Sequence, residues 1–192
     1  MILMIMLTAA VTENFVFARF LGICPFIGVS QRPKIAASMG AAVMFVMTIA
    51  CFVTWLIYHF ILSNPYFDLV YLRTIVFILI IASLVQLLEM YLKKMVPALH
   101  ATLGIYLPLI ATNCAILGAA FLAVENYDNL FVAIIFSVFS AAGFTMALLI
   151  FAGVRERLVF ADPPPFFKGL PLTLISAGLL AMAFMGFQGV SL

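Results

Sequence analysis

Six long apolar stretches dominate the sequence and decide what the chain can fold into. They run at about 2–30, 35–62, 71–92, 98–124, 130–153 and 169–190. A helix that spans a bilayer needs about 20 apolar residues, and the third, fifth and sixth stretches have this length. Only 8% of the residues are charged, against about 25% in soluble domains, so the chain cannot cover a water-facing surface. We expect an all-α integral membrane protein with six transmembrane helices.

Two of the stretches are too long for one span and contain residues that interrupt helices. These residues are Gly22 and Pro25 in the first stretch, and Gly104, Pro108 and Gly118 in the fourth. We expect both stretches to form discontinuous helices that are broken within the membrane. The apolar start of the chain has no basic region before it and soon reaches Glu13. It is therefore expected to be a membrane segment rather than a cleaved signal peptide.

Basic residues gather in every second loop. The odd-numbered loops hold 7 of the 9 Lys and Arg residues, namely Arg32, Lys34, Lys93, Lys94, Arg155, Arg157 and Lys168. The fourth loop has Glu125 and Asp128 without any base. Cytoplasmic loops carry the excess of Lys and Arg, so these odd loops should be cytoplasmic and both termini outside the cell membrane. Three spans per half then predict a single membrane domain, 1–192, of two inverted repeats, about 1–92 and 98–192.

Two cysteines occupy matching positions in the two broken stretches. "GICPFIGVS" at 22–30 contains Cys24 and Gly28, and "TNCAILGAA" at 112–120 contains Cys114 and Gly118. Inverted repeats with broken helices build sites near the membrane midplane, where the breaks meet. Cys24 and Cys114 are therefore expected to face each other there.

Two facing thiols suggest a metal site, although two simpler interpretations stay open. Thiolates bind zinc, copper(I) or iron–sulfur clusters, and such sites usually need four ligands. His59 and His100 do not match the repeat, so this chain would supply half of a site and a second subunit the other half. Alternatively the two cysteines fill space or form a disulfide. Cys51, which has no counterpart in the other half, is expected to be an apolar filler.

Three polar residues near the breaks are further candidates for a supporting role or an ion path. Glu13 is either a functional group within the membrane or an interfacial residue near the outer surface. Asn14 and Asn113 could cap broken helix ends or hold waters, and Asn113 adjoins a possible ligand. The sequence Arg155-Glu156-Arg157 could dock partner subunits or anchor the topology.

Several motifs resemble one known family over essentially the whole chain. They are "RFLGICPFIGVS", "YLRTIVFILIIASLVQLLEM", "LGIYLPLIATNCAILG" and "AGVRERL…DPPPFFKG…ISAGLLAMAFMGF". They resemble the A subunits of Rnf complexes, the ion-translocating ferredoxin:NAD oxidoreductases of bacterial and archaeal membranes. The E subunit of the sodium-translocating NADH:quinone oxidoreductase is a close relative, but "CPF" at 24–26 is more similar to the Rnf form. One departure is Glu13-Asn14, where the Rnf pattern usually has Asn-Asn.

The resemblance implies a shared redox centre. In this family the subunit pairs with a homologous subunit of opposite topology, similar to the Rnf E subunit, and the pair holds one [2Fe–2S] cluster. The family's ligands match Cys24 and Cys114 in this chain. The resemblance also implies electron transfer coupled to Na⁺ or H⁺ translocation, together with flavin, NADH-binding and ferredoxin-like subunits.

Motifs for other chemistry do not appear in the sequence. It lacks a dinucleotide-binding glycine fingerprint, a P-loop and a nucleophile elbow. We therefore expect no flavin or nucleotide on this chain, no hydride transfer within it and no nucleic-acid partner. Two alternative functions remain: a secondary transporter with structural cysteines, and a membrane scaffold with a Cys24–Cys114 disulfide.

Overall fold

The computed structural model describes residues 8–9, 14–62, 73–95, 109–110, 112–158, 160 and 164–186. Regular structure in these residues is helical throughout, as the sequence predicted. The helices are α2 (Ile23–Val29), α3 (Pro33–Ile57) with a π-helical turn after it (Tyr58–Leu62), α4 (Arg73–Met95), α7 (Cys114–Asn126), α8 (Leu130–Leu158), the 3₁₀ turn Pro165–Phe167 and α9 (Leu170–Met185).

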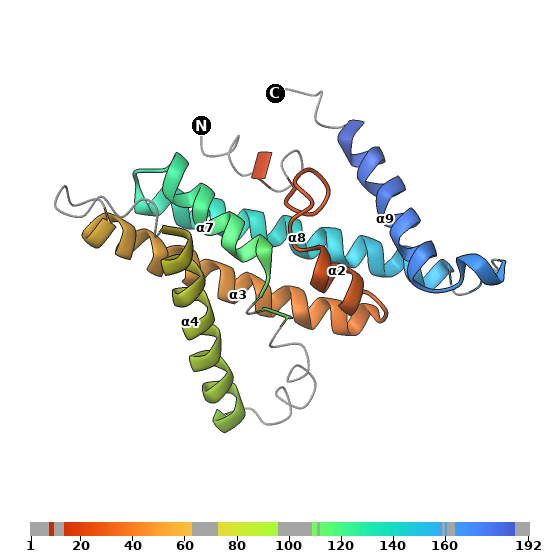
Figure 1. The fold of residues 1–192 in the computed structure, drawn as a ribbon, viewed down its shortest axis with the longest axis horizontal. Coiled ribbons are helices and arrows are strands. Elements are labelled where there is room, and N and C mark those ends of the chain that lie inside the picture. The colour runs from red at the N-terminus through yellow and green to blue at the C-terminus, as the bar shows by residue number, and fades with distance from the viewer. Residues whose placement is uncertain are drawn as a thin grey trace.

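Helices α3 and α8 form the centre of the molecule and run side by side in opposite directions (Figure 1). They are the two described helices that are long and apolar enough to cross a membrane. They pack closely where Gly40 of α3 faces Thr145 of α8, whose Oγ1 donates to the Gly40 carbonyl at 3.2 Å. A Cβ at Gly40 would overlap the Thr145 side chain. A small residue at this point therefore lets the two backbones approach, as is common between membrane helices.

Contacts at both ends of this pair fix the antiparallel arrangement. At one end, Trp55 Nε1 donates to the Tyr127 carbonyl at 3.0 Å, which places the end of α3 beside the start of α8. At the other end, Arg155 Nη1 donates to Ser30 Oγ at 2.9 Å. The loop before α3 therefore lies beside the last turn of α8.

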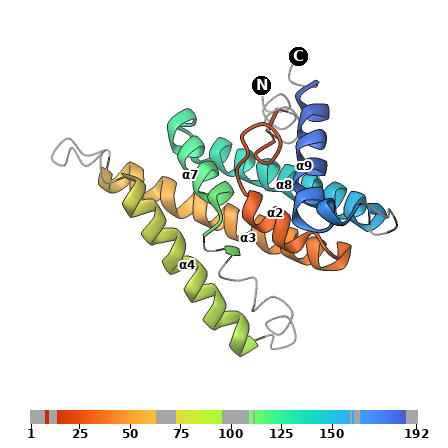
Figure 2. The same cartoon turned by 45° about the vertical axis from the view of Figure 1, so that its right-hand side comes forward.

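Helices α4 and α9 extend away from opposite ends of the central pair (Figures 1 and 2). On α4, the buried residues Phe77, Ile81 and Val85 recur every four positions and form its inner face. Most other large apolar side chains on these two helices are exposed, among them Leu79, Leu87, Leu174, Leu179 and Met182. Such an apolar exterior agrees with a protein that is surrounded by lipid or by partner helices.

Most helix boundaries in the described residues agree with the apolar stretches to within a few residues, but α9 ends at Met185 instead of about 190, and the end of α8 also differs. The sequence placed that end at about residue 153, whereas α8 continues to Leu158. Arg155-Glu156-Arg157 therefore belongs to the last turns of a helix and not to a loop. Of the six expected spans, only α3 and α8 have the length and hydropathy of a span among the described residues, whereas α4, α7 and α9 contribute shorter apolar helices there.

Candidate functional site

The first break is a compact loop over residues 14–22 that leads into α2. The Ala18 N–H donates to the Asn14 carbonyl at 2.9 Å and closes a single helical turn, and the Leu21 N–H reaches back to Phe15 O at 2.8 Å. The chain then passes through two positive φ angles, 55° at Phe20 and 83° at Gly22. L-residues rarely adopt this conformation, so the turn before α2 favours a glycine.

The second break ends at Asn113, directly before α7. The Asn113 side chain accepts a hydrogen bond from the Ala115 N–H at 3.1 Å, so it caps the helix that Cys114 begins. The sequence predicted that Gly118 interrupts a helix. This prediction was wrong, because Gly118 lies inside α7. Its lack of a side chain serves packing, since a Cβ there would lie 2.6 Å from Leu21 Cδ1. Gly104 and Pro108 lie outside the described residues.

Pro25 was also counted among the interrupting residues, and this too needs correction. It lies in the first turn of α2, two residues after the helix starts at Ile23. The first turn tolerates proline because its N–H groups have no partner within the helix. Among the described residues of this stretch, the segment without α-helix directly before α2 is therefore the loop over residues 14–22.

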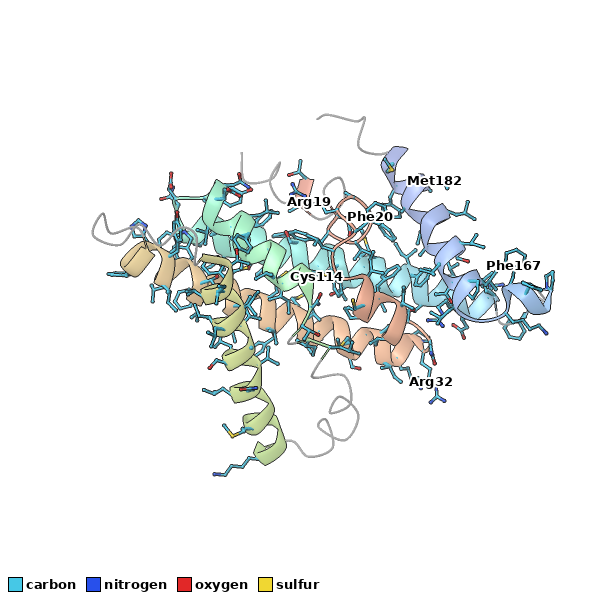
Figure 3. The ribbon with its side chains drawn as sticks, in the orientation of Figure 1. Arg19, Phe20, Arg32, Cys114, Phe167 and Met182 are labelled. Carbon is cyan, nitrogen blue, oxygen red and sulfur yellow. The ribbon has the colours of Figure 1, made fainter. Side chains whose placement is uncertain are left out.

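The two breaks meet at Gly22. The backbone N–H of Gly22 donates to Cys114 Sγ at 2.8 Å. A Cβ on Gly22 would lie 2.7 Å from Phe144 Cε2, 3.1 Å from Ala115 Cβ and 3.3 Å from Asn113 Oδ1. Cys24 follows two residues later, so at most about 7 Å separates its Cα atom from that of Gly22. The structure thus brings the two cysteine segments together at the middle of the molecule, where Figure 3 labels Cys114.

The three cysteines have different surroundings. Cys24 is exposed, Cys114 is partly buried, and Cys51 is buried within α3. All three are free thiols, so Cys24 and Cys114 form no disulfide with each other. In the described part of the chain, no group of three or more His, Cys, Asp or Glu residues could hold a metal ion. These residues therefore offer two sulfur ligands at the breaks and not a complete set of four.

The two candidate asparagines are both buried but differ in their partners. Asn14 Nδ2 donates to the Gly143 carbonyl of α8 at 2.8 Å, and its Oδ1 accepts from Val16 N at 3.0 Å. Asn14 therefore ties the first break to α8. Asn113 is only 2% exposed, and its Nδ2 has no hydrogen-bond partner among the described residues. Glu13, the third candidate, lies outside the described residues.

Aromatic rings hold the first break against the second half of the chain. Phe15 contacts Phe136 edge-on at 6.4 Å between ring centroids. Phe17 stacks on Phe184 of α9 at 4.4 Å, and Phe26 stacks on Phe151 of α8 at 4.2 Å. The sequence did not single out these rings. It contains no local signal of which ring meets which, because the partners are more than 120 residues apart.

Arg155 is a second feature that the sequence did not reveal. Its Nη1 donates to the Ile27 carbonyl at 2.7 Å and to Ser30 Oγ at 2.9 Å, at the C-terminal end of α2. The sequence suggested that Arg155 docks a partner or anchors the topology. The only available signal was its position four residues after Phe151, which places both side chains on one face of α8.

Comparisons with known proteins agree with a membrane protein. The profile of the Rnf-Nqr family, described as "Rnf-Nqr subunit, membrane protein", matches residues 2–191. The chain is 49% identical to the A subunit of the ion-translocating oxidoreductase complex of Syntrophotalea carbinolica, over 98% of this chain and 97% of the relative. It is also 49% identical to the A subunit of the Na⁺-translocating ferredoxin:NAD⁺ oxidoreductase complex of Acetobacterium woodii, over 100% of this chain and 98% of the relative. The chain therefore belongs to the Rnf-Nqr family of membrane subunits.

Proposed function

We propose that the chain is the A-type membrane subunit of an ion-translocating ferredoxin:NAD⁺ oxidoreductase, and that Cys24 and Cys114 provide two of the four ligands of a [2Fe–2S] cluster. The names of the relatives and their full-length similarity support this place in the complex. The contact that carries the cluster assignment is the one between the Gly22 N–H and Cys114 Sγ, because it joins the two cysteine segments.

The residues around this contact fit a bound iron–sulfur group. An N–H that donates to a cysteine sulfur stabilises a thiolate, and hydrogen bonds to the sulfurs help to set the reduction potential of such a cluster. Asn113 Nδ2, which has no hydrogen-bond partner among the described residues, is a second donor beside Cys114. A buried donor without a partner costs about 1–3 kcal/mol, so an acceptor bound at this place would fit the chemistry of the site. When bound, the cluster would supply one-electron transfer within the membrane.

A second subunit completes the proposed site. Two sulfurs leave two ligand positions open, and the exposed Cys24 is accessible to a neighbouring chain. We assign the missing pair to a homologous subunit of opposite topology. Flavin, NADH and ferredoxin-like chemistry then belongs to other subunits of the complex, and electron transfer is coupled to Na⁺ or H⁺ movement.

The inverted-repeat topology is part of the proposal. It is supported by the repeated order of a short helix, a long helix and a further helix in α2–α3–α4 and α7–α8–α9. The opposite directions of α3 and α8 also support it (Figure 2). Arg32, Lys34, Arg155 and Arg157 gather at one end of this pair, while Glu125 and Asp128 flank the start of α8 at the other. We assign the basic end to the cytoplasm, the chain to the cell inner membrane and both termini to the outside.

The decisive experiment replaces the ligands in the complete complex. Cys24→Ser and Cys114→Ser should each remove the cluster's electron paramagnetic resonance signal and its iron, while the subunit remains in the membrane. Cys51→Ala is the matched control, because it removes a buried thiol away from the breaks and leaves only a small void. Unchanged iron content in either serine variant would reject the ligand assignment, as would loss of the cluster in Cys51→Ala.

The shared site has its own test. The chain is expressed alone and together with its candidate partner, and iron is measured per chain. Iron should bind only when both subunits are present, because neither supplies four ligands. A stable cluster on this chain as a monomer would contradict the shared site. Ion transport that persists without iron or a partner would favour a secondary transporter instead.

A further inference from the structure

The short helix that carries Cys24 has little stability of its own. Helix α2 has only seven residues, Ile23–Val29, and isolated helices shorter than about 12–15 residues are marginal. Its last carbonyl groups have no partner within the helix. Contacts from elsewhere in the molecule must therefore hold α2, and with it Cys24, in place.

Helix α8 provides two such contacts from neighbouring turns. Phe151 stacks on Phe26 at 4.2 Å with an interplanar angle of 18°. Four residues later, Arg155 Nη1 donates to Ile27 O at 2.7 Å and to Ser30 Oγ at 2.9 Å. Ser30 itself is fully buried. The stacked rings fix one side of α2 and the guanidinium fixes its C-terminal end, so together they restrict both sliding and rotation of the short helix.

Arg155 differs in this respect from the charged residues next to it. Glu156 and Arg157 are exposed, whereas Arg155 is partly buried and directed at α2. A cation at a helix C-terminus also interacts favourably with the carbonyl groups there. A lysine could keep this charge, but it cannot reproduce the planar donor geometry of the guanidinium.

We propose that Arg155 is a positioning residue for the redox centre, which holds the Cys24 helix through the Ile27 carbonyl and Ser30 and places a positive charge near the cluster. This inference rests on the proposed function of Cys24. Through Arg155, the cytoplasmic end of α8 contacts the helix that carries one of the proposed ligands, Cys24. Because a nearby positive charge favours addition of an electron, its loss should shift the midpoint potential of the cluster to more negative values.

The first test compares Arg155→Gln, Arg155→Lys and Arg157→Gln in the complete complex. Arg155→Gln should lower the midpoint potential and alter the electron paramagnetic resonance spectrum, and Arg155→Lys should restore the potential in part. Arg157→Gln, which removes the same charge two residues away, should leave both unchanged. The proposal is overturned if Arg155→Gln matches the unmodified complex, or if Arg157→Gln causes the same shift.

A second measurement does not depend on the cluster, so it separates failure of this inference from failure of the proposed function. In a chain with Cys51→Ala and Cys114→Ala, Cys24 is the only remaining thiol. Maleimide labelling of Cys24 should become severalfold faster with Arg155→Gln, because α2 loses its anchor, but not with Arg157→Gln. Ser30→Ala, which removes one acceptor of Arg155, should give a smaller increase even if Arg155→Gln fails to assemble. Equal labelling rates in the variants that assemble would overturn the proposal.

Discussion

Gly22 connects backbone geometry to the chemistry of the proposed site. Its N–H contacts Cys114 Sγ, its φ angle is 83°, and Phe144 and Ala115 occupy the space where a side chain would be. The hydrogen bond, the positive φ and the missing side chain depend on one another. The left-handed turn directs the Gly22 N–H at the Cys114 sulfur, and this is possible only because the loop approaches α7 and α8 closely.

Gly22→Ala should therefore destabilise the site. The positive φ costs about 1–2 kcal/mol with a Cβ present, and the contact at 2.7 Å from Phe144 adds an overpacking cost of about 1–3 kcal/mol. We expect a lower melting temperature of the detergent-solubilised complex together with reduced iron content.

Gly28→Ala is the matched control for this prediction. It lies in α2, and the nearest atom to its added Cβ is Leu109 Cδ1 at an ordinary 3.9 Å. This variant should keep both melting temperature and iron. Equal behaviour of the two alanine variants would show that Gly22 has no special role.

The sequence revealed single residues better than it revealed their partners. The matching frames around Cys24 and Cys114 predicted that the two segments meet, and the structure places Gly22 against Cys114. Whether the two thiols bind a metal stays a prediction. The role of Arg155 was not visible, because a charge near a helix end satisfies the rule for membrane topology equally well. Only the folded chain shows that Arg155 faces Ile27 and Ser30.

At the scale of elements, the α3–α8 crossing is the contact on which the rest of the fold is arranged. Gly40→Ala should destabilise the protein by about 1–3 kcal/mol, because the new methyl group overlaps Thr145 in a packed interface. Thermal unfolding in detergent measures this loss. Gly153→Ala on α8 is the control, since no atom lies within 4 Å of its added Cβ.

A second-site change tests whether this overlap is the cause. In the double variant Gly40→Ala with Thr145→Ala, the smaller side chain makes room for the new methyl group. The combined loss should therefore be smaller than the sum of the two single losses. Strict additivity would mean that Gly40 acts through some other contact.

The sequence predicted some helix interruptions correctly and others wrongly, because glycine has two roles in helical proteins. A glycine both interrupts helices and permits close packing, and sequence alone does not distinguish these roles. Gly22 lies at an interruption, whereas Gly118 lies inside α7 against Leu21. The end of α8 was placed too early because charged residues end an apolar stretch without ending a helix.

At the scale of the whole molecule, charge distribution predicts orientation. A cysteine added after Leu192 should react with a membrane-impermeant maleimide in intact cells, because the C-terminus is expected outside. A cysteine in place of Lys94, which is exposed at the end of α4, should react only after the membrane is opened. The reverse pattern would overturn the orientation, and reaction of both cysteines from the same side of the membrane would overturn the inverted repeat.

The ring contacts between the first break and the last helices also determine the order in which the protein can be made. Phe26 of α2 packs on Phe151, 125 residues later, and Phe17 in the loop before α2 packs on Phe184, 167 residues later. At about 5–20 residues per second, a ribosome needs on the order of 10 to 30 s to synthesise either length. Helix α2 therefore lacks its ring partner until α8 has been synthesised, and the loop before α2 lacks its partner until almost the whole chain has been made. Assembly of the proposed site is thus a late step in biogenesis, after both halves of the chain have been inserted.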